Sequence, residues 1–149
     1  MPERKVRIIG CGNPLMGNDG VGLAVIERLR LDHPDLDCVE GGLGGLGLLP
    51  LMEGYDRVVI VDATTGYGSI GDVVVFHTLP DSRFFPMSLH DIGIVETVAV
   101  ARELGYAGDV VIIGIEGGAI DTFSDTLDPA VAAAIPRACR LVLSEVQKE

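Results

Sequence analysis

Three short segments of the chain are almost continuous in apolar residues: KVRIIGC (5–11), RVVIVDA (57–63) and DVVIIGI (109–115). Val- and Ile-rich runs of this length are typical of strands that are covered on both faces in a parallel sheet. Two weaker runs, 36–41 and 71–78, predict further strands. The second weak run ends in polar residues, as expected for a strand near an edge of the sheet.

Helical patterns separate these runs. Four segments carry apolar residues at helical spacing: 21–34, 45–55, 91–105 and the stretch that begins at 128. In the third segment, Ile94 and Val98 fall on one face. In the last, Asp128 and Pro129 have the signature of an N-cap and a first helical residue. Pro136 is expected to kink this helix or to split it in two.

The alternation of strands and helices predicts an α/β fold, a three-layer α/β/α sandwich with a mostly parallel twisted sheet of about five strands. The length suits a single domain over residues 1–149. In open sheets of this kind, ligand sites form at the carboxyl ends of the strands. Chemistry is therefore expected just after Cys11, Val39, Val61 and Ile115.

Charge and cysteine content indicate which partners the protein binds and in which compartment it works. A formal net charge of −11 disfavours nucleic acid and anionic membranes, and favours a metal ion, a cationic ligand or a basic segment of another protein. The 3 cysteines are widely spaced without a CxxC pair, which indicates free thiols in a reducing compartment. No apolar segment is long enough for membrane insertion. We expect a cytoplasmic protein, and a monomer.

The glycine-rich stretch GCGNPLMGNDGVG (10–22) follows the first predicted strand, where dinucleotide-binding loops also lie. Gly10 and Gly12 match that fingerprint, but Leu15 occupies the third glycine position. Pro14 lacks a backbone N–H that a phosphate would use, and Asp19 would repel an anion at the helix N-terminus. The glycines are better explained by tight turns and close packing than by phosphate binding.

Asp19, Asp62 and His90 form a candidate constellation. Each has an ordinary structural explanation: Asp19 as a helix cap, Asp62 as the cap of the turn after its strand, and His90 as a capping or surface residue. However, the fold predicts that all three lie at one edge of the sheet. Two carboxylates and an imidazole form a ligand set with open coordination positions, suited to Ni, Zn, Fe or Mn. An ion with open positions is available to a substrate or to hydrolysis.

The chain strongly resembles the hydrogenase maturation endopeptidases (peptidase family M52), which process the large subunit of nickel–iron hydrogenases. Three segments carry the resemblance: GCGNPLMGNDGVG, VVIVDATTGYGSIGDVVVF and SLHDIGIVETVAVARELG. Their order and separation agree from Arg7 to about Leu143. The resemblance implies an enzyme that hydrolyses a peptide bond and removes the C-terminal extension of the large-subunit precursor after nickel insertion.

The resemblance also assigns roles to individual residues. It places the metal-contacting and catalytic residues at Asp19, Asp62 and His90. The acidic-Gly-Gly motif, linked to substrate choice and cleavage, falls on Glu40, Gly41 and Gly42, and Asn13 belongs to the first signature as a substrate-binding residue. The metal implied is nickel held by the substrate, and other divalent ions such as Zn or Cd are expected to be able to occupy the site.

The chain departs from the family pattern at several positions. Asn18 stands where many relatives have a second acid, a change that would weaken metal contact. The acidic-Gly-Gly motif has Glu40 for Asp and Leu43 for a hydroxyl residue, which bears on substrate specificity. Glu116 lies in GIEGGAI, where relatives commonly have a Gln-Pro type sequence. We interpret Glu116 as capping a turn, the alternative being that it lines the cleft.

No Ser or Cys nucleophile in a recognisable elbow and no HExxH motif is present in the sequence. Hydrolysis by water, polarised by the metal or by a carboxylate such as Glu40, is the economical route. Two alternatives stay open. One is a non-catalytic checkpoint that binds the nickel centre of the precursor, and the other, less favoured, is a nucleotide-binding module.

Overall fold

The computed structural model describes residues 4–85, 92–120 and 123–149. Within them, five strands form a sheet in the order β2-β1-β3-β5-β4. The strands are β1 (Val6–Gly10), β2 (Cys38–Glu40), β3 (Arg57–Thr64), β4 (Val73–Phe76) and β5 (Asp109–Glu116). β4 pairs antiparallel to β5 at one edge, and the other pairs are parallel. The predicted mostly parallel α/β sheet, with the 71–78 segment at an edge, is confirmed.

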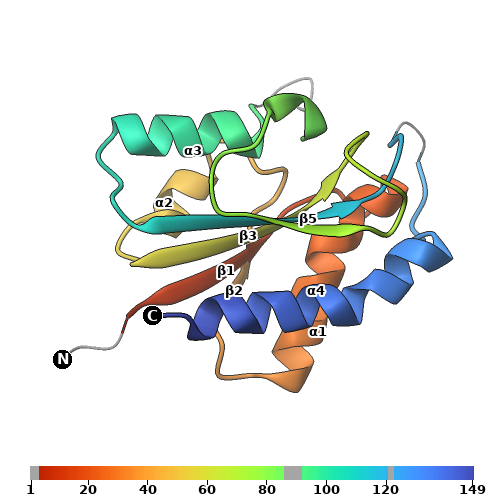
Figure 1. The fold of residues 1–149 in the computed structure, drawn as a ribbon, viewed down its shortest axis with the longest axis horizontal. Helices are drawn as coiled ribbons and strands as arrows, with labels where there is room; N and C mark the ends of the chain where they lie inside the picture. Colours follow the sequence, from red (N-terminus) through yellow and green to blue (C-terminus); the bar gives the residue numbers. More distant parts are fainter. Residues whose placement is uncertain (1–3, 86–91, 121–122) are drawn as a thin grey trace.

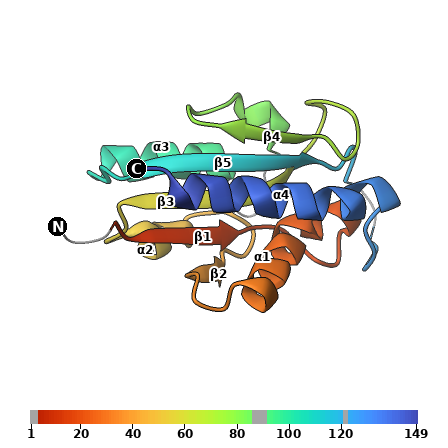
Figure 2. The same ribbon diagram turned by 60° about the horizontal axis from the view of Figure 1, so that its bottom comes forward.

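Helices cover both faces of the sheet. α1 (Val21–Asp32) and α4 (Pro129–Gln147) lie on one face, and α2 (Leu48–Met52) and α3 (Ile94–Glu103) lie on the other (Figures 1 and 2). Two short 3-10 helices, η1 (Gly17–Gly20) and η2 (Ser82–Phe84), lie in the connections. The result is the three-layer arrangement expected from the alternation of strands and helices.

The alternation of side chains along β3 shows why the central strands are apolar throughout. Val59 and Val61 are buried in the cluster beneath α1 and α4. Val58 and Ile60 are buried in the cluster on the face of α2 and α3. Each fully buried Val or Ile side chain stabilises the fold by roughly 1.5–3 kcal/mol. Because both faces of β3 are buried in apolar clusters, aliphatic residues are favoured at every one of these positions.

α4 continues as one helix through Pro136, so of the two predicted outcomes, a kink or a split, the split does not occur. Asp128 and Pro129 occupy the predicted N-cap and first helical positions. Apolar residues on both sides of the proline, including Val131 and Val142, are fully buried against the sheet. This packing on either side holds the two halves in one helix despite the missing backbone donor.

The remaining helices lie where the sequence predicts them, but their lengths differ from the predicted lengths. α2 covers only the middle of the predicted 45–55 segment, whose glycines disfavour helix. α3 begins at Ile94, and position 91, where the predicted helix starts, lies outside the described residues. None of the described helices is both long and apolar enough to span a bilayer. The single-domain organisation stays a prediction.

Candidate active site

The loop after β1 is shaped by glycines that cannot be replaced. Gly12 has φ of +136°, and a Cβ atom there would lie 1.8 Å from the carbonyl oxygen of Asp19. A Cβ on Gly22 would lie 2.3 Å from the carbonyl oxygen of Cys11 and 2.5 Å from that of Val61. The N-terminus of α1 therefore packs directly on the ends of β1 and β3. The interpretation of these glycines as close-packing residues is confirmed.

Asp19 lies in η1, within this loop, and is half-buried. Its Oδ2 accepts a hydrogen bond of 2.8 Å from the backbone N–H of Asn13. Burial raises the pKa of the Asp19 carboxyl, and the bond from Asn13 opposes this rise. The Asn13 side chain accepts from Leu15 N at 2.9 Å, so it stabilises the turn that presents Asp19.

Asp62 lies within β3, which continues one residue further than the predicted segment 57–63. The strand extends because Asp62 pairs in register with Gly114, and Thr64 with Glu116. Alternation places the Asp62 side chain on the same face as Val58 and Ile60, the face that α3 covers. Its Oδ1 accepts a hydrogen bond of 2.8 Å from the adjacent Ala63 N–H.

The two carboxyl groups interact electrostatically. The pKa of Asp62 is raised well above its ordinary value, first by burial and then by the negative charge of Asp19, and the Ala63 bond opposes the rise. Two neighbouring carboxyl groups, one of which raises the pKa of the other, are a poor structural pair and a good site for a cation. The structure thus brings Asp19 and Asp62 to one site, as the sequence predicts.

The third predicted residue of the constellation, His90, lies outside the described residues. Across residues 4–85, 92–120 and 123–149, no group of three His, Cys, Asp or Glu side chains has the arrangement of a metal site. The two carboxylates nevertheless fit a divalent ion chemically, since they are oxygen donors whose mutual repulsion a cation would relieve. The ligand roles of Asp19, Asp62 and His90 stay predictions.

Cys11 lies beside the carboxylate pair and is fully buried. Burial raises the pKa of its thiol well above the usual range, and the charges of Asp62 and Asp19 raise it further. A thiolate is thereby disfavoured, and the thiol behaves as a small apolar side chain. Cys38 and Cys139 are also free thiols.

The acidic-Gly-Gly motif lies next to the first loop. Gly41 N donates to Gly10 O at 2.8 Å, and Gly12 N donates to Gly42 O at 2.8 Å. Glu40, the last residue of β2, is exposed at the same edge of the sheet. The structure therefore brings the predicted residues Gly41 and Gly42 to the loop that carries Asp19, while the roles assigned to them and to Glu40 stay predictions.

Glu116, at the end of β5, organises the neighbouring loop. Its buried carboxylate accepts from the Thr64 hydroxyl at 2.8 Å. It also accepts from four backbone N–H groups, at 2.9 to 3.2 Å, those of Gly66, Tyr67, Gly68 and Gly118. These bonds close the turn that follows β3, so the turn-capping interpretation is the one the geometry supports. All of these partners except Gly118 are 48 to 52 residues away in sequence, so no local sequence pattern predicts them.

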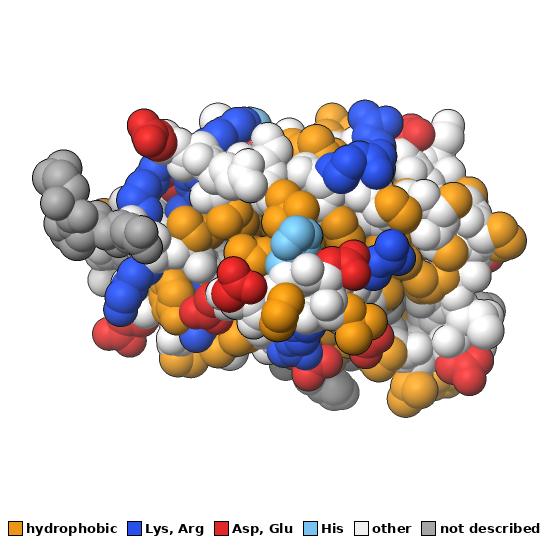
Figure 3. Space-filling model, turned by 90° about the horizontal axis from the view of Figure 1, so that it is seen from below, with side chains coloured by type: hydrophobic (Ala, Val, Ile, Leu, Met, Phe, Trp, Pro, Cys, Tyr) orange, Lys and Arg blue, Asp and Glu red, His pale blue; other side chains and the backbone are white. Residues whose placement is uncertain are grey.

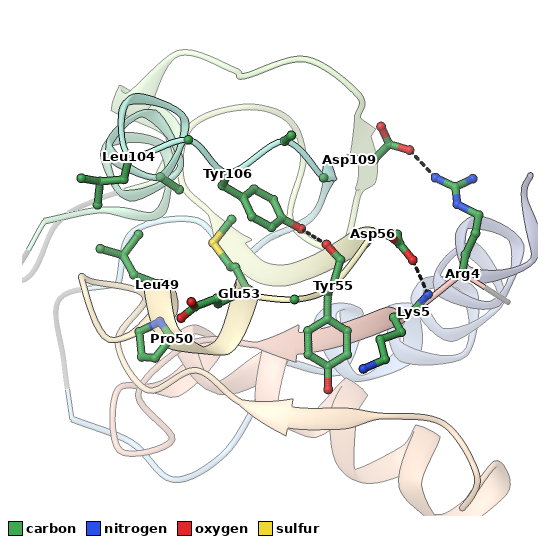
Figure 4. A pocket seen from close by; sticks show the side chains of 16 residues that line it. Arg4, Lys5, Leu49, Pro50, Glu53, Tyr55, Asp56, Leu104, Tyr106 and Asp109 are labelled. Carbon is green, nitrogen blue, oxygen red and sulfur yellow. Dashed lines mark hydrogen bonds and ion pairs between the residues drawn. The ribbon is translucent and has the colours of Figure 1, made fainter. Parts of the chain in front are cut away.

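An open groove of ≈ 1320 Å³ lies at the opposite edge of the sheet, around Lys5, Tyr55 and Tyr106. In Figure 4, Arg4 pairs with Asp109, the Tyr106 hydroxyl donates to Tyr55 O, and the backbone N–H of Lys5 donates to Asp56. The residues around it precede the strands, whereas Asp19 and Asp62 lie where strands end. The groove is thus separate from the candidate site.

Comparisons with protein families and with individual known proteins agree with one another. The family model for HycI, hydrogenase maturation protease, matches residues 23–145. The hydrogenase expression/formation protein HupD of Rhodobacter capsulatus is 29% identical over 153 residues, covering 98% of this chain and 72% of that protein.

Two solved structures have the same fold. The hydrogenase maturating endopeptidase HybD of Escherichia coli superposes with a TM-score of 0.81 at 22% identity, over 96% of this chain and 92% of that one. The hydrogenase 2 maturation peptidase of Thaumarchaeota archaeon SCGC_AB-539-E09 has a TM-score of 0.69 at 28% identity, over 98% of this chain and 100% of that one. The chain therefore belongs to the hydrogenase maturation protease family, whose members are endopeptidases that hydrolyse a peptide bond.

Proposed function

We propose that this endopeptidase removes the C-terminal extension of a nickel–iron hydrogenase large-subunit precursor after nickel insertion. Asp19 and Asp62, with His90, contact the nickel that the precursor carries. Nickel is in this sense part of the substrate, and the contact positions the scissile peptide. Holding the reacting groups in place contributes to catalysis by lowering the entropy lost on reaching the transition state.

The observation that carries this proposal is the charge coupling between Asp19 and Asp62 at the carboxyl edge of the sheet. Two interacting, partly buried carboxyl groups cost the protein stability, since their ionised forms repel one another. A precursor that presents a cation offsets this cost, and a precursor without metal does not. The pair therefore favours nickel-loaded over nickel-free substrate.

The surface around the pair also supports a protein substrate. Six exposed large apolar residues belong to loops at this edge: Leu15, Leu43, Leu46, Tyr67, Ile70 and Phe123. The loop segments 11–20, 41–47, 65–72, 117–120 and 123–128 contain no Lys or Arg. Hydrophobic, acidic and uncharged side chains occupy the right-hand end of Figure 3. Arg83, in nearby η2, is paired with Asp81 at 3.1 Å.

The chain's own groups also suit hydrolysis by water. A carboxylate with a raised pKa, such as Asp62, is a stronger base than an ordinary Asp and accepts a proton from water more readily. The buried Cys11 thiol is unsuited to act as a nucleophile, because its pKa is raised. Glu40 is exposed beside Gly41 and Gly42 and is a second candidate proton acceptor.

The free thiols of the chain suit a cytoplasmic location.

The test uses the purified large-subunit precursor of a nickel–iron hydrogenase from the same organism, in nickel-loaded and nickel-free forms. We expect the enzyme to lower the mass of the nickel-loaded precursor only. Complex formation without a change in mass would instead support the non-catalytic checkpoint. Full cleavage by a His90→Ala variant would contradict the role of that residue in metal contact.

A further inference from the structure

Asn18 precedes Asp19 in η1, and its side chain joins the loop to a distant part of the chain. Its Nδ2 donates to Gly117 O at 2.9 Å and to Asp128 Oδ2 at 3.1 Å. Its Oδ1 accepts from the backbone N–H of Asp128 at 2.8 Å. One amide thus connects the first loop to the end of β5 and to the N-cap of α4.

These partners determine which residue type fits at position 18. The oxygen of the amide faces an N–H group, and its nitrogen faces two oxygen atoms, so only one orientation of the amide is satisfied. A carboxylate at this position would place a second oxygen against the Gly117 carbonyl and the Asp128 carboxylate. The site is therefore built for an amide.

The packing leaves little freedom for adjustment. A Cβ atom on Gly117 would lie 2.9 Å from Asn18 Cβ, so the two segments are in close contact. Two backbone bonds join the same segments: Gly17 N donates to Ser124 O at 2.7 Å, and Ser124 N donates to Leu15 O at 2.9 Å. Asp19 follows directly in the chain, and its orientation depends on how this part of the loop is held.

We propose that Asn18 is a positioning residue, which sets the direction of the Asp19 carboxylate by holding η1 against the β5–α4 connection. This inference rests on the proposed function, in which Asp19 contacts a metal. It reverses the expectation that an acid at position 18 would improve metal contact. A carboxylate there would break the connection to Gly117 and Asp128 and would displace Asp19.

The sign of the effect of Asn18→Asp on cation binding therefore tests the proposal. We expect Asn18→Asp to weaken Cd²⁺ binding, measured by calorimetry, by about tenfold, the usual effect of losing a group that orients a metal ligand. We also expect kcat for the nickel-loaded precursor to fall by about tenfold with KM little changed. The double variant Asn18→Asp/Asp128→Asn restores a donor opposite the new carboxylate and should recover part of both losses.

Val142→Ala, on the buried face of α4, is the control for a general loss of stability. It is compared with Asn18→Asp at a temperature where both variants are folded. This control should keep wild-type cation affinity and kcat. Tighter or unchanged Cd²⁺ binding by Asn18→Asp would overturn the proposal, as would an equal loss in Val142→Ala or a wild type that binds no Cd²⁺. A wild type that binds Cd²⁺ but never shortens the precursor would overturn the proposed function alone, provided that Asn18→Asp weakens that binding.

Discussion

The backbone N–H of Asn13 donates a hydrogen bond of 2.8 Å to Oδ2 of Asp19. In the same turn, Gly12 closely approaches the carbonyl oxygen of Asp19. The bond favours the ionised form of a carboxyl group that burial otherwise disfavours. The loop therefore holds a carboxylate in place before any cation arrives. Its geometry depends on residues that carry no charge themselves.

Gly12→Ala should prevent this loop from forming. The new Cβ would clash with Asp19 O at 1.8 Å, and the backbone has φ of +136°. We expect a loss of more than about 3 kcal/mol in the free energy of unfolding, measured by urea denaturation. Gly54→Ala is the matched control, since Gly54 has φ of +85° and open space around its Cβ. It should lose about 1 kcal/mol. Equal losses in the two variants would contradict the close-packing explanation.

Asp62→Asn should stabilise the metal-free protein. The substitution removes a charge that burial and Asp19 both disfavour, while it keeps the acceptor for the Ala63 N–H. We expect a gain of about 1 kcal/mol, or a rise of roughly 2–4 °C in Tm, at pH 7 in the presence of EDTA. Asp35→Asn, an exposed carboxylate near the other edge of the sheet, should leave Tm unchanged. A fall in the Tm of Asp62→Asn would count against the electrostatic coupling.

Glu116 should contribute stability that is lost in acid. Burial alone would raise the pKa of Glu116, but hydrogen bonds from Thr64, Tyr67, Gly66 and Gly118 outweigh burial and lower it from 4.5. A lowered pKa means that the folded state binds fewer protons than the unfolded state, so this stability is present above about pH 4.5 and is lost as pH falls towards the folded pKa.

Glu116→Gln replaces one acceptor by a donor that faces N–H groups, and should cost about 2 kcal/mol at pH 7. Its unfolding free energy, followed from pH 7 to pH 3, should also fall less steeply than that of the wild type. A slope equal to that of the wild type would show that Glu116 does not titrate as described.

Cys11→Ala should leave the reaction intact. Cys11 is fully buried and its thiol has a raised pKa, so it is a packing residue beside the site. We expect a loss of about 1 kcal/mol in stability from the lost packing and a cleavage rate within about twofold of the wild type. A rate more than tenfold lower, in a variant that is still folded, would indicate that the sulfur takes part in the chemistry.

The sequence predicts the strands well, because β1, β3 and β5 are buried on both faces and their Val and Ile runs have no competing explanation. It also predicts that Asp19 and Asp62 lie together, since the loops after β1 and β3 meet at one edge of such a sheet, while their roles stay predictions. The partners of Asn18 and Glu116 could not be predicted. Asn18 bonds to Asp128, 110 residues away, and Glu116 bonds to Thr64, 52 residues away.

The continuity of α4 and the exact end of β3 also could not be predicted from local sequence. Pro136 lacks a helical donor, and only the buried residues on both sides of it, such as Val131 and Val142, explain why α4 continues. In the same way, β3 extends through Asp62 to Thr64 because β5 pairs with it there. Tertiary packing decided both outcomes.

The most direct test of the central claim compares Asp62→Asn with Asp35→Asn on nickel-loaded precursor, by following the precursor mass over time. Both variants remove one carboxylate, but only Asp62 is coupled to Asp19. We predict that Asp35→Asn shortens the precursor at the wild-type rate, whereas Asp62→Asn, although folded, is slower by at least about 100-fold. Cleavage by Asp62→Asn at the wild-type rate would contradict the assignment of this carboxylate pair as the active site.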